Sequence, residues 1–251
     1  MPPIAFLSYS KPDEAATHRL YMDFMLHNAT PRMMQLVIDD VAQRQKMLHQ
    51  SIRSTDVVLA IVSANTEDTA LQQEQVEIAL LSDKPIRAVV LDSGTLPTWL
   101  TSRVQEVVSY SFADQAWDDA MLNLLTSLAI PLQDLGDQLP ETEAWVPDKW
   151  RVKFYNGATN AHGYGELELK DDHSVNGTLN IAQGKLTAQT SVTATWKLEG
   201  RELTIEGQQI VRPMRQPLSY LLSVTISQFG ALTFRAQTAQ GDDSVFQRAP
   251  K

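Results

Sequence analysis

Short polar segments follow the apolar runs in the first half of the chain, and their side chains are the ones that could do chemistry. The loop from Ser63 to Thr69 follows one such run, Ser8 to Ser10 follows another, and Asp39 ends a third. In a parallel sheet covered by helices, ligands bind at the carboxyl ends of the strands. This arrangement predicts a ligand site at the loop from Ser63 to Thr69.

The composition excludes several other kinds of site. The 251 residues include no cysteine, which excludes disulfides, thiolate catalysis and cysteine-ligated zinc. The five histidines are scattered without ligand spacing, so we expect no metal site. A net charge of −9 argues against binding to nucleic acid, because phosphates are bound by basic surfaces. No apolar run could span a bilayer and no signal peptide is visible, so we expect a cytoplasmic protein that does not bind membranes.

The stretch from Asp56 to Asp92 predicts the elements that would position this site. The near-continuous apolar run from Val57 to Val62 is typical of a strand buried on both faces. Apolar residues from Leu71 to Leu80 recur at helical spacing, and Ile86 to Leu91 predicts a second buried strand. Strand, helix and strand in this order form a right-handed βαβ unit of a parallel sheet.

The rest of residues 1–132 continues this alternation of strands and helices. Further strands are predicted at Ile4–Leu7, Met34–Ile38 and Val104–Tyr110, and further helices after Pro12, at Val41–Arg53 and at Trp117–Ile130. The order predicts an α/β flavodoxin-like domain with a five-stranded parallel sheet.

The composition changes after this domain. Residues 133–148 are rich in proline and acidic residues without periodicity, which predicts a linker. Residues 149–251 show no helical pattern but many short alternating segments separated by turn signals. The predicted strands are Trp150–Tyr155, Gly163–Lys170, Ser174–Ile181, Ser191–Leu198, Glu202–Val211, Tyr220–Gln228, Leu232–Gln237 and Val245–Arg248. About eight antiparallel strands of this length favour an all-β closed barrel, which has no free edges.

An ordered set of segments in the first domain carries a family resemblance. These segments are IAFLSYS, LVIDD, SIRSTDVVLAIVSANT and VEIALLSDKPIRAVVLD, together with Trp117 near the last helix. In this order they resemble a prokaryotic, enzymatic Toll/interleukin-1 receptor (TIR) domain. The resemblance implies an NAD glycohydrolase that releases nicotinamide and leaves ADP-ribose or a cyclised isomer. NAD would then be the substrate, and no cofactor is expected.

The resemblance also implies a catalytic glutamate, which this chain lacks. The family places it four residues before the small residue of an E-x-x-x-A pattern, and counting back from Ala79 gives Gln75. An amide keeps the shape of glutamate but not its charge. Three accounts remain: an inactivating replacement of glutamate at Gln75, a natural pseudoenzyme, or a shifted helix register that uses Glu74. Without the resemblance, Gln75 is equally an ordinary solvated helix position.

Further site residues follow from the same resemblance. Ser8, Tyr9 and Ser10 match the loop that contacts the nucleotide in the family, and Asp39 matches an acidic residue near the substrate pocket. Ser63 and Asn65 would line that pocket. Each of these residues is as readily explained as a helix cap, a packed side chain or a turn residue.

The second domain would control the first. The arrangement resembles antiphage defence effectors, in which a sensor domain drives TIR domains to self-assemble, and the barrel resembles lipocalin-like barrels by strand count. An eight-stranded barrel can hold one small ligand. Candidates for binding a phosphate-bearing ligand such as a cyclic nucleotide are Arg151, Tyr155, Trp196 and Arg235. The alternatives are that these charged residues face water and these aromatic residues fill the core.

Two other functions fit the same pattern. The chain could be a non-enzymatic adaptor or virulence protein that acts by TIR–TIR binding. It could also be an NAD glycohydrolase triggered by a protein ligand, such as a phage component, on the barrel surface.

Overall fold

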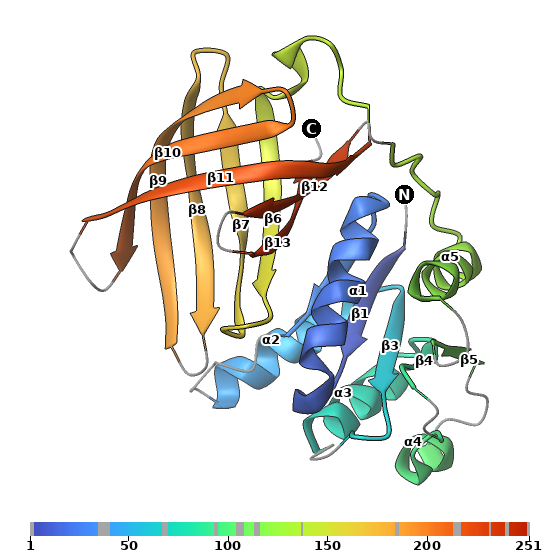
Figure 1. The fold of residues 1–251 in the computed structure, drawn as a ribbon. Helices are drawn as coiled ribbons and strands as arrows, with labels where there is room; N and C mark the ends of the chain where they lie inside the picture. The colour runs from blue at the N-terminus through green and yellow to red at the C-terminus, as the bar shows by residue number, and fades with distance from the viewer. Residues whose placement is uncertain are drawn as a thin grey trace. The chain divides into compact units, whose positions relative to one another are not determined.

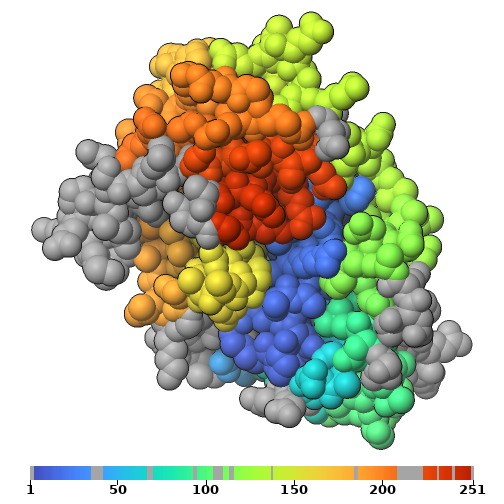
Figure 2. All heavy atoms as spheres, in the orientation of Figure 1, coloured from blue at the N-terminus to red at the C-terminus, as the bar shows by residue number. Residues whose placement is uncertain are grey.

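A computed structural model describes residues 3–34, 41–66, 70–92, 95–103, 108–112, 116–136, 138–183, 186–212, 217–230, 232–238 and 241–249. The chain divides into two compact units, Met1–Leu132 and Gln133–Lys251. Figure 2 shows all heavy atoms, coloured along the chain from the N-terminus to the C-terminus. Among these residues, no helix has both the length and the apolar character needed to cross a bilayer.

The first unit is a parallel α/β sheet with helices on both faces (Figure 1). Its elements are β1 (Ile4–Ser8), η1 (Lys11–Asp13), α1 (Glu14–Leu26), β2 (Thr30–Met33), α2 (Val41–Arg53), β3 (Val57–Val62), α3 (Ala70–Leu81), β4 (Ile86–Val90), α4 (Thr98–Arg103), β5 (Val108–Ser111) and α5 (Trp117–Ser127). The strand order is β2-β1-β3-β4-β5, and every pair is parallel. The predicted five-stranded sheet is confirmed.

Alternation along the central strands creates two hydrophobic cores, one on each face of this sheet. Leu59 and Ile61 of β3 pack in the core that includes α1 and α5. Val58 and Ala60 pack in the core that includes α2, α3 and α4. Because successive side chains of a strand point to opposite faces, the fully apolar run in β3 is explained by burial on both sides.

The strand Thr30–Met33 was not predicted, and two predicted strands lie partly outside the described residues. In the predicted second strand, Met34–Ile38, Met34 is not in a strand and residues 35–38 lie outside the described residues. Pro31 makes Thr30–Met33 a poor candidate by sequence, but β2 is an edge strand, where proline is tolerated. The predicted fifth strand, Val104–Tyr110, coincides with β5 from Val108 onward, and its residues 104–107 lie outside the described residues. The loop expected before it contains the short helix α4.

The second unit is an antiparallel barrel of eight strands. They are β6 (Asp148–Asn156), β7 (Ala161–Leu169), β8 (Ser174–Gln183), β9 (Leu186–Glu199), β10 (Glu202–Arg212), β11 (Pro217–Phe229), β12 (Thr233–Thr238) and β13 (Asp243–Arg248). Strand β13 pairs with β6, which closes the sheet and confirms the predicted barrel. Gly165 and Gly177 allow the backbones of β7 and β8 to approach closely, because a Cβ at either position would collide with the backbone of the neighbouring strand.

The segment predicted as a linker packs onto the barrel. Gly136 forms a two-way backbone bridge with Phe229, and the short helix η2 (Glu143–Trp145) follows it. Trp145 lies edge-on against Trp150, Phe229 and Phe234 of the barrel core. The pattern-free composition of residues 133–148 concealed this, because one bridge and one buried indole leave no periodicity in the sequence.

Candidate functional site

The carboxyl ends of β1 and β3 form the natural ligand edge of the first unit. From β1 the chain continues to β2 on one side and later to β3 on the other, so the strand order reverses between β1 and β3. In open α/β sheets ligands bind outside the strands at such a reversal. The β1–β3 pairing ends at Ser8 and Ala60, and helix α3 begins a few residues after β3.

Gln75 lies at this edge and is not a solvated position. Its side chain is 3% exposed, and its Oε1 accepts a hydrogen bond of 2.6 Å from Oγ of Ser8. Ser8 itself is fully buried. The structure therefore brings together two of the predicted site residues that are 67 positions apart in the chain.

The neighbouring glutamates on α3 are less buried than Gln75. Glu77 is exposed and pairs with Arg103 at 3.1 Å, while Glu74 is half-buried. The register of α3 therefore gives the buried position to Gln75 and not to Glu74.

A second buried amide, which the sequence interpretation missed, lies one turn before Gln75. Nε2 of Gln72 donates to the backbone oxygens of Ser8, at 3.0 Å, and Ile61, at 2.7 Å. Its side chain is 1% exposed, and its Oε1 has no hydrogen-bond partner among the described residues. The available signal was the spacing, since residues three apart on a helix share a face.

A buried carboxylate, also missed, organises the loops beside this edge. Asp13 is 3% exposed, and its Oδ2 accepts hydrogen bonds of 2.8 Å from Oγ of Ser10 and from Oγ1 of Thr66. Thr66 in turn accepts a hydrogen bond from the backbone nitrogen of Ser63 at 2.7 Å. Asp13 thus connects the loop after β1 with the loop after β3. The signal in the sequence was a serine followed three residues later by a carboxylate at a helix start.

The remaining predicted residues of the first unit fall in different surroundings. Tyr9 is buried, and burial together with the nearby charge of Glu14 raises the pKa of its hydroxyl well above the ordinary value. Asn65 is exposed, and its backbone nitrogen donates to Oγ of Ser63 at 3.1 Å. Asp39 lies outside the described residues.

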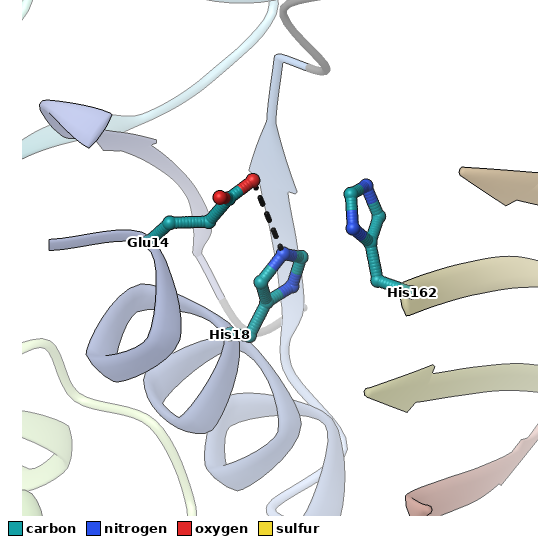
Figure 3. A group of neighbouring side chains, drawn as sticks. All are labelled: Glu14, His18 and His162. Carbon is teal, nitrogen blue, oxygen red and sulfur yellow. Dashed lines mark ion pairs between the residues drawn. The ribbon is translucent and has the colours of Figure 1, made fainter. Parts of the chain in front are cut away.

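Glu14 and His18 form a pair on α1. Nε2 of His18 lies 4.0 Å from Oε1 of Glu14, and Figure 3 shows both side chains on the same side of the helix. A zinc site needs about three protein ligands or more, so this pair by itself does not form one.

The barrel candidates do not share one face of the wall. Arg151 and Tyr155 alternate along β6 with core residues, and Arg235 alternates with core residues along β12, so all three belong to the outer face. The guanidinium of Arg235 is held by Asp243 through bonds of 3.0 and 2.6 Å. Tyr155 donates to Oδ1 of Asn160 at 3.2 Å.

Trp196 belongs instead to the barrel core. It is 3% exposed, its indole nitrogen donates to the backbone oxygen of Lys170 at 2.9 Å, and His173 stacks on it at 4.4 Å. Its environment is that of a packed core residue.

Two grooves are lined by described residues, and none of the predicted site residues lines either. One, of about 540 Å³, lies between Leu139–Glu143 and the turn that joins β9 to β10. Its two carboxylates, Glu141 and Glu143, outnumber Arg201, which disfavours a phosphate-bearing ligand. The other, of about 500 Å³, runs along α2 beside Lys46 and Arg53.

Comparisons with known proteins give no family. No protein-family model matches the chain, and a search of curated proteins finds no match in sequence. Among solved structures, a 2-deoxyribosyltransferase from Bacillus psychrosaccharolyticus aligns with 51% of this chain and 98% of its own, at 11% identity and a TM-score of 0.38. The translation elongation factor SelB from Methanococcus maripaludis, with a GTP analogue, aligns with 99% of this chain and 52% of its own, at 11% identity and a TM-score of 0.33. A von Willebrand factor type A protein from Catenulispora acidiphila aligns at 7% identity and a TM-score of 0.31, over 98% of this chain and 65% of its own. Similarities this low carry no functional argument.

Proposed function

We propose that the first unit is a TIR-type domain that binds NAD at the carboxyl ends of β1 and β3, with residue 75 in the place of the catalytic carboxylate. With glutamate at this position the domain would be an NAD glycohydrolase. With glutamine it would hold the dinucleotide but cleave it slowly or not at all.

The burial and bonding of Gln75 carry this proposal. A glutamine on a solvated helix face has no reason to be 3% exposed with its Oε1 held at 2.6 Å by a buried hydroxyl. Its place beside the reversal of strand order is where ligands of α/β sheets bind. Glutamate has the same length and would accept the same hydrogen bond from Ser8.

The chemistry explains why the charge at residue 75 matters. Cleavage of the N-glycosidic bond of NAD passes through a ribose with oxocarbenium character, as glycoside hydrolysis does. A carboxylate beside the sugar stabilises the positive charge that develops, and such fixed electrostatic groups contribute about a hundredfold or more to rate. A neutral amide can hold a ribose hydroxyl but cannot supply this stabilisation.

The test is NAD cleavage by the Gln75→Glu variant beside the unsubstituted chain. A matched control is Gln73→Glu, which adds the same charge on the same helix at a position that is not fully buried. We expect Gln75→Glu to release nicotinamide at least about a hundredfold faster than the unsubstituted chain, and Gln73→Glu to remain at the slower rate. If both variants remain at the slower rate both alone and with cyclic nucleotides, the proposed activity is wrong.

For the second unit we propose control of this activity by a small phosphate-bearing ligand, such as a cyclic nucleotide. Closed barrels of eight strands either are filled by their own side chains or hold one small ligand, and the second of these arrangements supports the proposal. Assembly of the TIR domains would be the step that such a ligand triggers, in an antiphage defence response. The matching test is the cleavage rate of Gln75→Glu with and without a panel of cyclic nucleotides. A rate that no nucleotide changes would favour a protein ligand on the barrel surface.

The neutral amide at residue 75 favours a second candidate, a non-enzymatic adaptor that acts by TIR–TIR binding. The two candidates differ in NAD binding. An adaptor would show no saturable binding of NAD by calorimetry, and Gln75→Glu would not change its self-association.

A further inference from the structure

The backbone hydrogen bonds between β1 and β3 stop at the point where the candidate site begins. The last paired residues are Ser8 and Ala60. Beyond them, the carbonyl groups of Ser8 and Ile61 lie on neighbouring strands and both accept from Nε2 of Gln72. One side-chain amide therefore continues the connection between the two strands, using both of its hydrogens.

The hydrogen bonds of Gln72 also fix the hydrogen bond between Ser8 and Gln75. Because Gln72 holds the backbone of Ser8 at 3.0 Å, the Ser8 hydroxyl is held in place to donate to Oε1 of Gln75 at 2.6 Å. All three side chains are buried, so water does not compete for these hydrogen bonds. A branched apolar residue at position 72 would fill similar space without the cost of a buried, unsatisfied Oε1, so packing alone does not account for an amide at this position.

We propose that Gln72 and Ser8 are positioning residues for the side chain of residue 75, a role that rests on the proposed function of residue 75. Gln72 holds the strand end, Ser8 selects the rotamer of residue 75, and the free half of that residue's head group is presented to the ligand. In the unsubstituted chain the presented group is the amide nitrogen. After Gln75→Glu it is the second carboxylate oxygen, while Ser8 continues to donate to the first.

The first arm of the test does not depend on activity. The side-chain amide of Gln75 is observed by NMR in the full chain, and its signal is assigned by its disappearance in Gln75→Glu. We expect a restrained amide, with the order parameter of a rigid group, about 0.85, and a clear fall to below about 0.6 in Ser8→Ala and in Gln72→Leu. The control is Thr55→Val, which removes another buried hydroxyl bond, at 2.7 Å to the oxygen of Ile52, at the opposite end of β3. The control should leave the Gln75 amide unchanged.

The second arm uses cleavage in the Gln75→Glu background. Adding Ser8→Ala should lower kcat for NAD about tenfold or more and change KM by less than about threefold, because a charge-assisted hydrogen bond to the reacting group is lost while the rest of the binding surface remains. Adding Ser8→Thr, which keeps the hydroxyl, should recover part of kcat. Thermal unfolding of each variant separates loss of positioning from loss of folding.

The two arms separate the two proposals. If Gln75→Glu does not cleave NAD but the amide loosens in Ser8→Ala, the proposed function is wrong and the positioning stands. If the amide stays restrained in Ser8→Ala and Gln72→Leu, the positioning role is overturned whatever the activity. If Ser8→Ala unfolds the chain, Gln72→Leu decides the question by the same measurement.

Discussion

The hydroxyl of Ser8 at the end of β1 donates a hydrogen bond of 2.6 Å to Oε1 of Gln75 on α3. Both residues are buried, and the bond lies at the edge of the sheet where α/β folds bind ligands. A glutamate at position 75 would accept the same hydrogen bond and add a negative charge, which is the basis of the function that we propose for this site.

The register of α3 makes a prediction about the neighbouring glutamate. In the Gln75→Glu background, Glu74→Gln should leave the rate of NAD cleavage within about threefold, because Glu74 is only half-buried and lies about 100° round the helix from residue 75. The measurement is nicotinamide release under saturating NAD. A loss of about a hundredfold would instead show that Glu74 is the essential carboxylate.

The carboxylate of Asp13 should be important for the stability of the first unit. Asp13→Ala leaves the hydroxyls of Ser10 and Thr66 without their acceptor inside the protein, and we expect the free energy of unfolding to fall by about 2–4 kcal/mol. Urea unfolding measures this. The control is Asp118→Ala, whose side chain is 97% exposed and 3.8 Å from Arg19, and it should cost less than about 1 kcal/mol. Equal effects of the two substitutions would contradict the role of Asp13.

The indole of Trp145 should stabilise the barrel. Trp145→Ala removes an aromatic side chain that packs against Trp150, Phe229 and Phe234, so we expect a loss of about 3–5 kcal/mol. Leu186→Ala is the matched control, since this side chain is 75% exposed and its loss should change stability by less than about 0.5 kcal/mol. Unfolding followed by near-ultraviolet circular dichroism distinguishes them. A Trp145→Ala variant as stable as the control would show that residues 133–148 behave as a free linker.

The first unit should lose stability on mild acidification through His27. Partial burial lowers the pKa of this imidazole below its ordinary value of 6.5, so the unfolded chain takes up the proton first as the pH falls. Stability from this group is therefore full above pH 6.5 and decreases as the pH falls from 6.5 toward the lowered pKa of the folded state. His27→Gln should flatten this part of the stability profile measured by urea unfolding at several pH values. A profile of the same slope in the variant would contradict the assignment.

The fold could be predicted because its signals are repetitive. The apolar run in β3, the helical spacing in α3 and the alternation along β9 each extend over several residues, and all eight barrel strands occur where alternation indicated them. The predictions failed where one local feature outweighed the pattern. Thr30–Met33 contains a proline that only an edge strand accepts, and the six residues of α4 are too few to show a helical period.

The site was less predictable because its important contacts join distant parts of the chain. Position 75 could be singled out, but the roles of Gln72 and Asp13 depend on backbone and hydroxyl groups of other elements that no spacing reveals. The residues proposed to bind a ligand in the barrel show a second limit of prediction from the sequence. Alternation with Trp150 already implied that Arg151 belongs to the outer face, so choosing residues by chemistry alone selected side chains from both faces of the wall.

An NAD-cleaving site at residue 75 is tested most directly by the rate of nicotinamide release from NAD by Gln75→Glu, compared with the unsubstituted chain, alone and with cyclic nucleotides. We expect release at least about a hundredfold faster from the variant, with or without a nucleotide requirement. Rates that remain equal under every condition, in a variant shown to be folded, would contradict an NAD-cleaving site at residue 75.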